Sequence, residues 1–211
     1  YFNRKAVKVE NYAAGGRSSR SFYNENGRWN AIKANAKKGD YVLVSFAHND
    51  GQSDKNSEYY TDAFGDVNNQ TSYKYWLNKY RTESEELGLN MILISPIPRN
   101  KWENGKLGTD ALSYHINAMR EFAAEYNVPF VDLNTAARET VSSMGEEGSK
   151  QMYLMFNPAD YADDPYFAGS DYNTTAVVKD TTHLKAAGAD MVAAGIAAGL
   201  SRIEGIRDYI K

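Results

Sequence analysis

The chain has 211 residues, enough to bury a sizeable core, and we expect residues 1–211 to form a single domain. A formal net charge of −3 argues against nucleic acid as a partner. The absence of cysteine excludes disulfides, zinc–thiolate sites and a thiol nucleophile. No run of about eighteen apolar residues occurs, so we expect no span of a membrane.

The first part of the chain predicts a strand followed by a glycine turn. Residues 6–13 alternate apolar and polar side chains, which is typical of a β-strand. Gly15 and Gly16 come next, and consecutive glycines let the backbone turn tightly and present bare N–H groups to a ligand. A plain strand-to-helix turn is the alternative interpretation.

Apolar runs predict further strands at 41–47, 91–97 and 129–133, the first two buried on both faces of a parallel sheet. Polar residues follow these runs: Asn49 after the first, Arg99 and Trp102 after the second. In open α/β sheets ligands bind at the carboxyl ends of the strands, so these residues are candidates for a site. An Asx turn that merely closes the first strand is equally compatible with residues 48–51.

Amphipathic helices are predicted between these strands. One ends at Gly88, and another, around 116–126, is expected to carry His115 on its surface. Alternating strands and helices predict an α/β fold of three layers with a parallel sheet. Residues 149–179 are expected to be irregular and rich in aromatic rings, either a self-packed surface loop or the wall of a binding cleft that includes Tyr166.

The segment 178–189 holds an acidic and a basic side chain three residues apart, Asp180 and His183, just before a small-residue helix predicted over 183–203. On a turn or a first helical turn such residues share a face, so Asp180 could accept a hydrogen bond from the ring of His183. That bond would fix the tautomer and leave the other ring nitrogen able to take a proton from a hydroxyl. The alternative is a helix N-cap followed by a surface histidine.

Several blocks of sequence occur together in one order. They are N-Y-A-A-G-G-R-S-S-R-S-F at 11–22, G-R-W at 27–29, G-D-Y-V-L-V-S-F-A-H-N-D at 39–50, S-P-I-P-R at 95–99 and D-T-T-H-L-K-A-A-G-A at 180–189. In this respect the chain resembles the SGNH (GDSL-type) hydrolases, and most closely the rhamnogalacturonan acetylesterase group among them. The resemblance extends over essentially the whole chain.

The resemblance implies a flavodoxin-like fold and a serine esterase that removes acetyl groups from a plant cell-wall polysaccharide of the rhamnogalacturonan or pectin type. It implies a Ser-His-Asp mechanism without metal or other cofactor, and a secreted or extracytoplasmic protein. His183 would be the general base and Asp180 its orienting carboxylate, while Gly16 and Asn49 would donate to the oxyanion. Arg99, Trp102 and Tyr166 are expected to contact the substrate.

Two departures from the family pattern matter. Ala47 stands where the family usually has glycine. The Gly-Asp-Ser block that carries the nucleophile is absent, so the first strand and helix are expected to be missing from this chain and the nucleophile is unknown. Ser18, Ser19 and Ser21 match other family positions and are not expected to replace it. We therefore expect the chain alone to be inactive and to need a complementing N-terminal segment.

Two other functions remain open from the sequence. The chain could be a non-catalytic relative that binds an acetylated glycan without cleaving it. It could also be an esterase with the same machinery that acts on acetyl-xylan or on small lipid esters.

Overall fold

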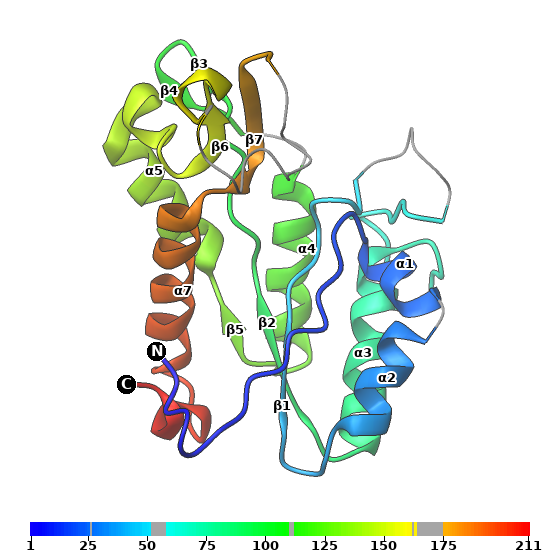
Figure 1. Ribbon diagram of the computed structural model, residues 1–211. Helices are drawn as coiled ribbons and strands as arrows, with labels where there is room; N and C mark the ends of the chain where they lie inside the picture. Colours follow the sequence, from blue (N-terminus) through cyan, green and yellow to red (C-terminus); the bar gives the residue numbers. More distant parts are fainter. Residues whose placement is uncertain (26, 52–57, 110–111, 162, 164–174) are drawn as a thin grey trace. The chain divides into compact units, whose positions relative to one another are not determined.

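The computed structural model describes residues 1–25, 27–51, 58–109, 112–161, 163 and 175–211 (Figure 1). The chain divides into two compact units, and each is described by itself. Unit 1 comprises Tyr1–Pro96, Thr109–Asn134 and Ile196–Lys211, and unit 2 comprises Ile97–Gly108 and Thr135–Gly195. The expectation of a single domain stays a prediction.

Unit 1 contains a parallel sheet. Its strands β1 (Tyr41–Val44), β2 (Asn90–Ile94) and β5 (Phe130–Val131) lie in the order β1-β2-β5. These are three of the four expected strands, and all are parallel as predicted. Each is a short apolar run, which suits a sheet that is covered by helices.

The central strand β2 shows how the sheet is covered. Met91 and Leu93 join the core formed with α3 (Tyr73–Glu86) and α4 (Leu112–Glu125). Because side chains alternate along a strand, Ile92 and Ile94, also buried, point to the opposite face. There α7 (Ala186–Leu200) approaches so closely that a Cβ on Gly199 would lie 2.3 Å from Val131 Cγ1. Unit 1 is thus an α/β arrangement of three layers, the predicted fold class (Figure 1).

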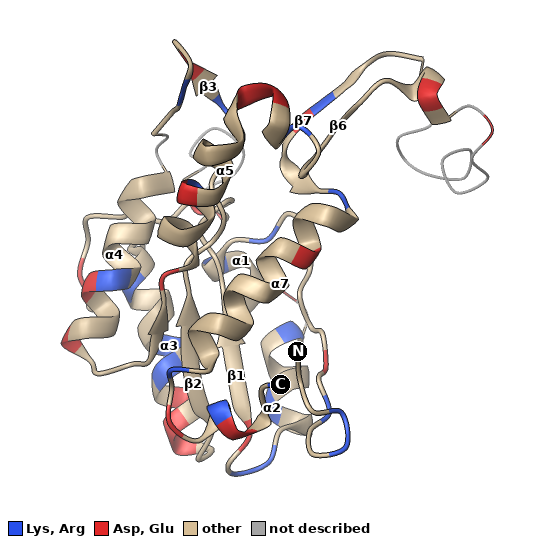
Figure 2. Cartoon of the chain, turned by 90° about the vertical axis from the view of Figure 1, so that its left-hand side faces the viewer, with Lys and Arg blue, Asp and Glu red and all other residues tan. Residues whose placement is uncertain are grey.

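Small, uncharged residues make the close approach of α7 possible. Asp190 is the one charged residue in the helix, which is almost wholly tan in Figure 2. The helix begins at Ala186 rather than at the expected residue 183, because residues 178–184 form a strand.

Two short helices pack on the α3 side of the sheet of unit 1, opposite α7 (Figure 1). They are α1 (Ser19–Asn24) and α2 (Arg28–Asn35), and both belong to the segment that precedes β1. Glu83 of α3 holds them in place, since it accepts hydrogen bonds from Tyr23, Trp29 and Lys33. The 3₁₀-helix η2 (Ile206–Tyr209) ends the chain.

The expected strand at 6–13 is not formed. Residues 7–13 have no regular secondary structure and no described strand pairs with them, and a strand without a partner has no ladder of hydrogen bonds. For the same reason β1 lies at the edge of the described sheet. Leu43 is 39% exposed, so the prediction that this strand is buried on both faces was wrong.

Unit 2 is built on two antiparallel strand pairs. One pair is β3 (Trp102–Glu103) with β4 (Lys106–Leu107), and the other is β6 (Tyr153–Phe156) with β7 (Val178–Leu184). The remaining elements are α5 (Leu133–Ser149), which is interrupted at Gly145, and the 3₁₀-helix η1 (Pro158–Tyr161). The described part of the segment 149–179 is therefore more regular than expected.

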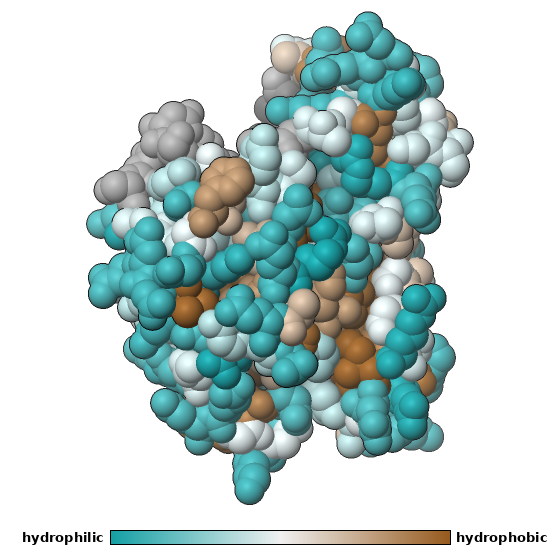
Figure 3. Space-filling model, turned by 180° about the vertical axis from the view of Figure 1, so that it is seen from behind, coloured by the Kyte–Doolittle hydropathy of each residue, from teal (hydrophilic) through white to brown (hydrophobic). Residues whose placement is uncertain are grey.

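The surface seen from behind is mostly hydrophilic, and its hydrophobic atoms gather in separate patches (Figure 3). Among the helices that the structure describes, none combines the length and the apolar character needed to cross a bilayer.

Candidate active site

Asp180 and His183 lie in a bulge of β7. The ladder pairs Tyr153 with Leu184 but Met155 with Lys179, so residues 180–183 bulge out of the regular register. Asp180 Oδ1 accepts the backbone N–H groups of Thr182 at 2.8 Å and His183 at 3.0 Å. The expected local contact is present, although the segment is a bulged strand and not the start of a helix.

The imidazole of His183 is oriented by Asp180. Nδ1 of the ring lies 2.7 Å from Asp180 Oδ2, which leaves Nε2 as the proton acceptor. The His183 side chain is 67% exposed and that of Asp180 22%. Burial alone would raise the pKa of Asp180, but hydrogen bonds from His183 and Thr182 outweigh it and lower the pKa below its ordinary value. Asp180 is therefore an ionised acceptor at neutral pH.

Asn100 connects the loop after β2 to this bulge. Its N–H donates to Thr181 O at 2.8 Å, and its Oδ1 accepts from Trp102 Nε1 at 2.6 Å. The predicted substrate residues Arg99 and Trp102 therefore belong to a loop that is bonded to the bulge, whereas Tyr166 lies outside the described residues. Asn100 itself is 4% exposed and was missed, because an Asn in a polar loop gives no signal of burial.

The two predicted oxyanion residues lie in unit 1. Gly16 has a φ of 76°, in the left-handed region that glycine adopts without strain. Asn49 Nδ2 donates to Arg17 O at 3.2 Å, which holds the glycine turn beside the Asn49 side chain. The expectation that these residues meet Asp180 and His183 stays a prediction.

Asp50 joins the start of α1 to the loop that follows β1, and it was not identified as a candidate residue from the sequence. Its buried carboxylate accepts from Ser19 N at 3.1 Å, Ser19 Oγ at 2.5 Å, Ala47 N at 3.0 Å and Thr61 Oγ1 at 3.0 Å. Burial raises the pKa of Asp50, although the hydrogen bonds from Ser19 and Thr61 act in the opposite direction. Its position directly after Asn49 could have drawn attention to Asp50. Its bond to Ser19, 31 residues earlier, could not be predicted from a local sequence pattern.

Ser18, Ser19 and Ser21 are buried and engaged in the structure of α1. Ser18 is the N-cap, and its Oγ accepts the N–H of Ser21 at 3.1 Å. Ser21 Oγ accepts the N–H of Ser18 at 2.9 Å, which completes a capping box. With Ser19 bonded to Asp50, all three hydroxyls have structural partners. The expectation that none of them is the nucleophile stays a prediction.

Ala47 adopts a backbone conformation that suits glycine. Its φ is 124° and its side chain is buried, so the departure from the family's usual glycine carries strain. The N–H of Ala47 is held by Asp50, which fixes this conformation.

His115 is buried, so the expectation that it lies on a helix surface was wrong. Its Nε2 lies 2.9 Å from the carbonyl oxygen of Thr61, and since a carbonyl can only accept, this nitrogen carries the proton. The ring also meets Tyr73 edge-on at 5.1 Å between centroids. His115 therefore anchors α4 to the loop that follows β1.

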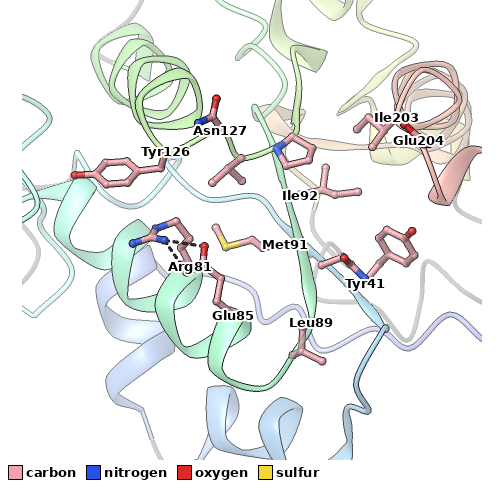
Figure 4. A pocket seen from close by; sticks show the side chains of 13 residues that line it. Tyr41, Arg81, Glu85, Leu89, Met91, Ile92, Tyr126, Asn127, Ile203 and Glu204 are labelled. Carbon is pink, nitrogen blue, oxygen red and sulfur yellow. Dashed lines mark hydrogen bonds and ion pairs between the residues drawn. The ribbon is translucent and has the colours of Figure 1, made fainter.

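A cavity of about 240 Å³ in unit 1 lies at the other end of the sheet (Figure 4). Its lining includes the first residues of β2 and the Arg81–Glu85 ion pair. Because Asn49 follows the carboxyl end of the parallel strand β1, this cavity is remote from it. Among the described residues no group of three or more His, Asp or Glu side chains could hold a metal ion.

Two curated proteins are similar to this chain in sequence over most of its length. It is 32% identical over 197 residues to the probable rhamnogalacturonan acetylesterase YesY of Bacillus subtilis (strain 168), covering 93% of this chain and 78% of the relative. It is 28% identical over 200 residues to the rhamnogalacturonan acetylesterase RhgT of the same organism, covering 94% and 76%.

Solved structures share the fold. The Bacillus subtilis protein YXIM aligns with a TM-score of 0.71 at 22% identity over 96% of this chain, which spans 48% of that structure. An acetylxylan esterase from Geobacillus stearothermophilus aligns with a TM-score of 0.53 at 18% identity, covering 87% and 68%. Residues 2–191 match the GDSL-like Lipase/Acylhydrolase family, and the chain belongs to that family.

Proposed function

We propose that this protein removes acetyl groups from a plant cell-wall polysaccharide of the rhamnogalacturonan type by a Ser-His-Asp mechanism. The named acetylesterases among its relatives support an acetyl-removing carboxylic ester hydrolase. The observation that carries the mechanism is the 2.7 Å contact between Asp180 Oδ2 and His183 Nδ1. An extracytoplasmic location is part of the proposal, because the polysaccharide lies outside cells.

In the proposed reaction His183 is the base and then the acid. Its Nε2 takes the proton of an attacking serine hydroxyl while the serine oxygen bonds to the acetyl carbonyl carbon. The bond from that carbon to the sugar oxygen then breaks, and His183 returns its proton to the sugar oxygen. Water attacks the acetyl-serine by the same route and releases acetate. Asp180 stabilises the imidazolium that forms in each half-reaction.

The oxyanion in this scheme is stabilised by the backbone N–H of Gly16 and the side-chain amide of Asn49. Oxyanion donors of this kind each contribute about 3–4 kcal/mol to the transition state. The bond from Asn49 to Arg17 O supports the proposal, since it keeps both donors on neighbouring loops of unit 1.

The attacking hydroxyl is proposed to come from a segment that is not among these 211 residues. The structural engagement of Ser18, Ser19 and Ser21 supports this, because a buried hydroxyl inside a capping box cannot reach a polysaccharide. Such a segment would be the chain's partner in activity.

The test is the release of acetate from acetylated rhamnogalacturonan. The 211-residue chain would be assayed with and without an upstream strand–Gly-Asp-Ser–helix segment, and each form with His183→Ala. We expect release only with the segment, and loss of release in the variant. Acetate release by the chain alone that survives replacement of Ser18, Ser19 and Ser21 by Ala would refute the assignment of the nucleophile. Glycan binding without release in either form would favour a non-catalytic relative.

A further inference from the structure

Two aromatic rings stand exposed in contact with each other on unit 1. Phe64 is 79% exposed and Tyr114 is 52% exposed, and their ring centroids are 5.2 Å apart. Large rings in water that also touch one another form an apolar surface that is not part of the core.

The loop that carries Phe64 is held in one conformation by its own hydrogen bonds. Asp62 N donates to Thr71 O and Tyr73 N donates to Asp62 O, so the loop closes at its base. Asp62 Oδ1 accepts the backbone N–H of Phe64 at 2.9 Å. Gly65 packs so tightly that a Cβ there would lie 2.5 Å from Ser72 Cβ. A ring presented by such a loop loses little conformational entropy when it binds a ligand.

Thr61 connects the aromatic pair to the Asn49 loop. Its N–H donates to Asp50 O at 2.8 Å, and its carbonyl oxygen accepts from His115, the residue after Tyr114. Phe64 is three residues from Thr61, a reach of about 10 Å. Both rings therefore lie within about the length of a few sugar rings of Asn49.

We propose that Phe64 and Tyr114 form a binding surface for an uncharged pyranose ring of the polysaccharide. An aromatic face covers the apolar C–H face of a sugar, and exposed polar groups beside it can bond its hydroxyls. Asp66, Asn68 and Asn69 supply such groups in the same loop and are exposed. The acidic neighbours Asp62 and Asp66 disfavour a uronate or an anionic lipid headgroup at this position. The inference rests on the proposed function for its choice of polysaccharide.

The experiment measures binding, so it does not depend on catalysis. The 211-residue chain, Phe64→Ala, Tyr114→Ala and the double variant would be titrated by calorimetry with acetylated rhamnogalacturonan oligosaccharides. We expect Kd to rise about tenfold in the double variant and less in each single variant. Tyr1→Ala, which removes a ring of similar exposure (57%) elsewhere in unit 1, should leave Kd unchanged. The loss should be equal at low and high salt, because the contact involves no ion pair.

Three results would overturn the inference. They are an unchanged Kd in the double variant, a loss that appears only at low salt, and a change of oligomeric state in sedimentation without a change in Kd, which would make the rings a contact between copies. Hydrolysis by the active form with no effect of the variants on Kd would sink this inference alone. Ring-dependent binding together with no hydrolysis by the form that includes the nucleophile segment would sink the proposed function alone.

Discussion

Two aspartates in this protein have the same side chain and opposite surroundings. Asp180 of unit 2 is 22% exposed, and hydrogen bonds from residues within three positions lower its pKa. Asp50 of unit 1 is fully buried, its partners include Ser19 31 residues earlier, and burial raises its pKa. The comparison teaches that a carboxylate with local partners can orient one ring for chemistry, whereas one with distant partners holds loops together.

Replacing Asp180 should have the largest effect, and the effect should fall on chemistry. In an active form that includes the nucleophile segment, Asp180→Asn is expected to lower turnover about 10⁴-fold with little change in KM, because the amide favours the wrong tautomer of His183. Steady-state kinetics on an acetyl ester measure this. Asp190→Asn on α7 is the matched control and should keep full turnover. Unchanged turnover in Asp180→Asn would reduce Asp180 to a structural cap of the bulge.

Replacing Asp50 should act on stability instead. Asp50→Ala leaves the donors of Ser19, Ala47 and Thr61 buried without an acceptor, so we expect a loss of about 3–5 kcal/mol in the free energy of unfolding. Urea denaturation of the 211-residue chain measures it. The exposed Asp208→Ala should change stability by less than about 0.5 kcal/mol. If the two variants were equally stable, the contrast between local and distant partners would fail.

Replacing Asn49 tests whether the loop held by Asp50 stabilises the oxyanion of the transition state. Asn49→Ala is expected to reduce turnover of the active form about 10²–10³-fold, the usual effect of losing one oxyanion donor. The defect should be equal on aryl acetates and on polysaccharide, because both form the same oxyanion. Asn35→Ala, which removes an amide bonded to Ala31 O, is the control. A defect seen with polysaccharide alone would move Asn49 to sugar binding.

Glu83 adds a third carboxylate, with many partners and moderate burial. Burial alone would raise its pKa, but hydrogen bonds from Lys33, Tyr23 and Trp29 lower it to about 2 from an ordinary value of 4.5. Its stabilising effect is therefore complete above pH 4.5 and lost as pH falls toward 2. At neutral pH Glu83→Gln should cost roughly 2 kcal/mol, and the difference should shrink with acid.

Thermal unfolding between pH 7 and pH 2 measures this effect of Glu83. Glu85→Gln is the control, since the Glu85 side chain is 60% exposed in its ion pair with Arg81 and should contribute little at any pH. A pH-independent difference between Glu83→Gln and the parent would contradict the ionic origin of the effect.

The smallest expected effect is a gain at Ala47. Glycine adopts a φ of 124° without strain, so Ala47→Gly should stabilise unit 1 by about 1 kcal/mol and leave turnover unchanged. Ala36→Gly, at a residue with a φ of −71°, should instead destabilise by about 0.5–1 kcal/mol. Chemical denaturation of the two variants would show opposite signs, and a loss at both positions would mean that Asp50 fully relieves the strain.

The sequence predicted those features that depend on local patterns. The apolar runs at 41–47, 91–97 and 129–133 begin within one residue of the starts of β1, β2 and β5. The Asp180–His183 contact was also predicted, although a bulged strand makes it and not the expected turn or helix start. Each of these is encoded within a few consecutive residues.

Features that depend on distant partners were not predicted. Residues 6–13 have the alternation of a strand but no described neighbour to pair with, and β6 pairs with a strand, β7, that begins some twenty residues after β6 ends. The burial of His115 is decided by the Thr61 carbonyl, 54 residues earlier in the chain. Contacts between residues so far apart in the sequence leave no periodic pattern of apolar and polar residues from which they could be predicted.

The burial of Ser18, Ser19 and Ser21 determines how the protein responds to covalent probes of serine enzymes. Fluorophosphonate reagents tag a hydroxyl that is both accessible and activated, and these three are buried. A band labelled by such a reagent would therefore report a hydroxyl outside this trio. The probe thus offers a direct readout of whether a nucleophile has been brought to His183, without any need to know the natural ester.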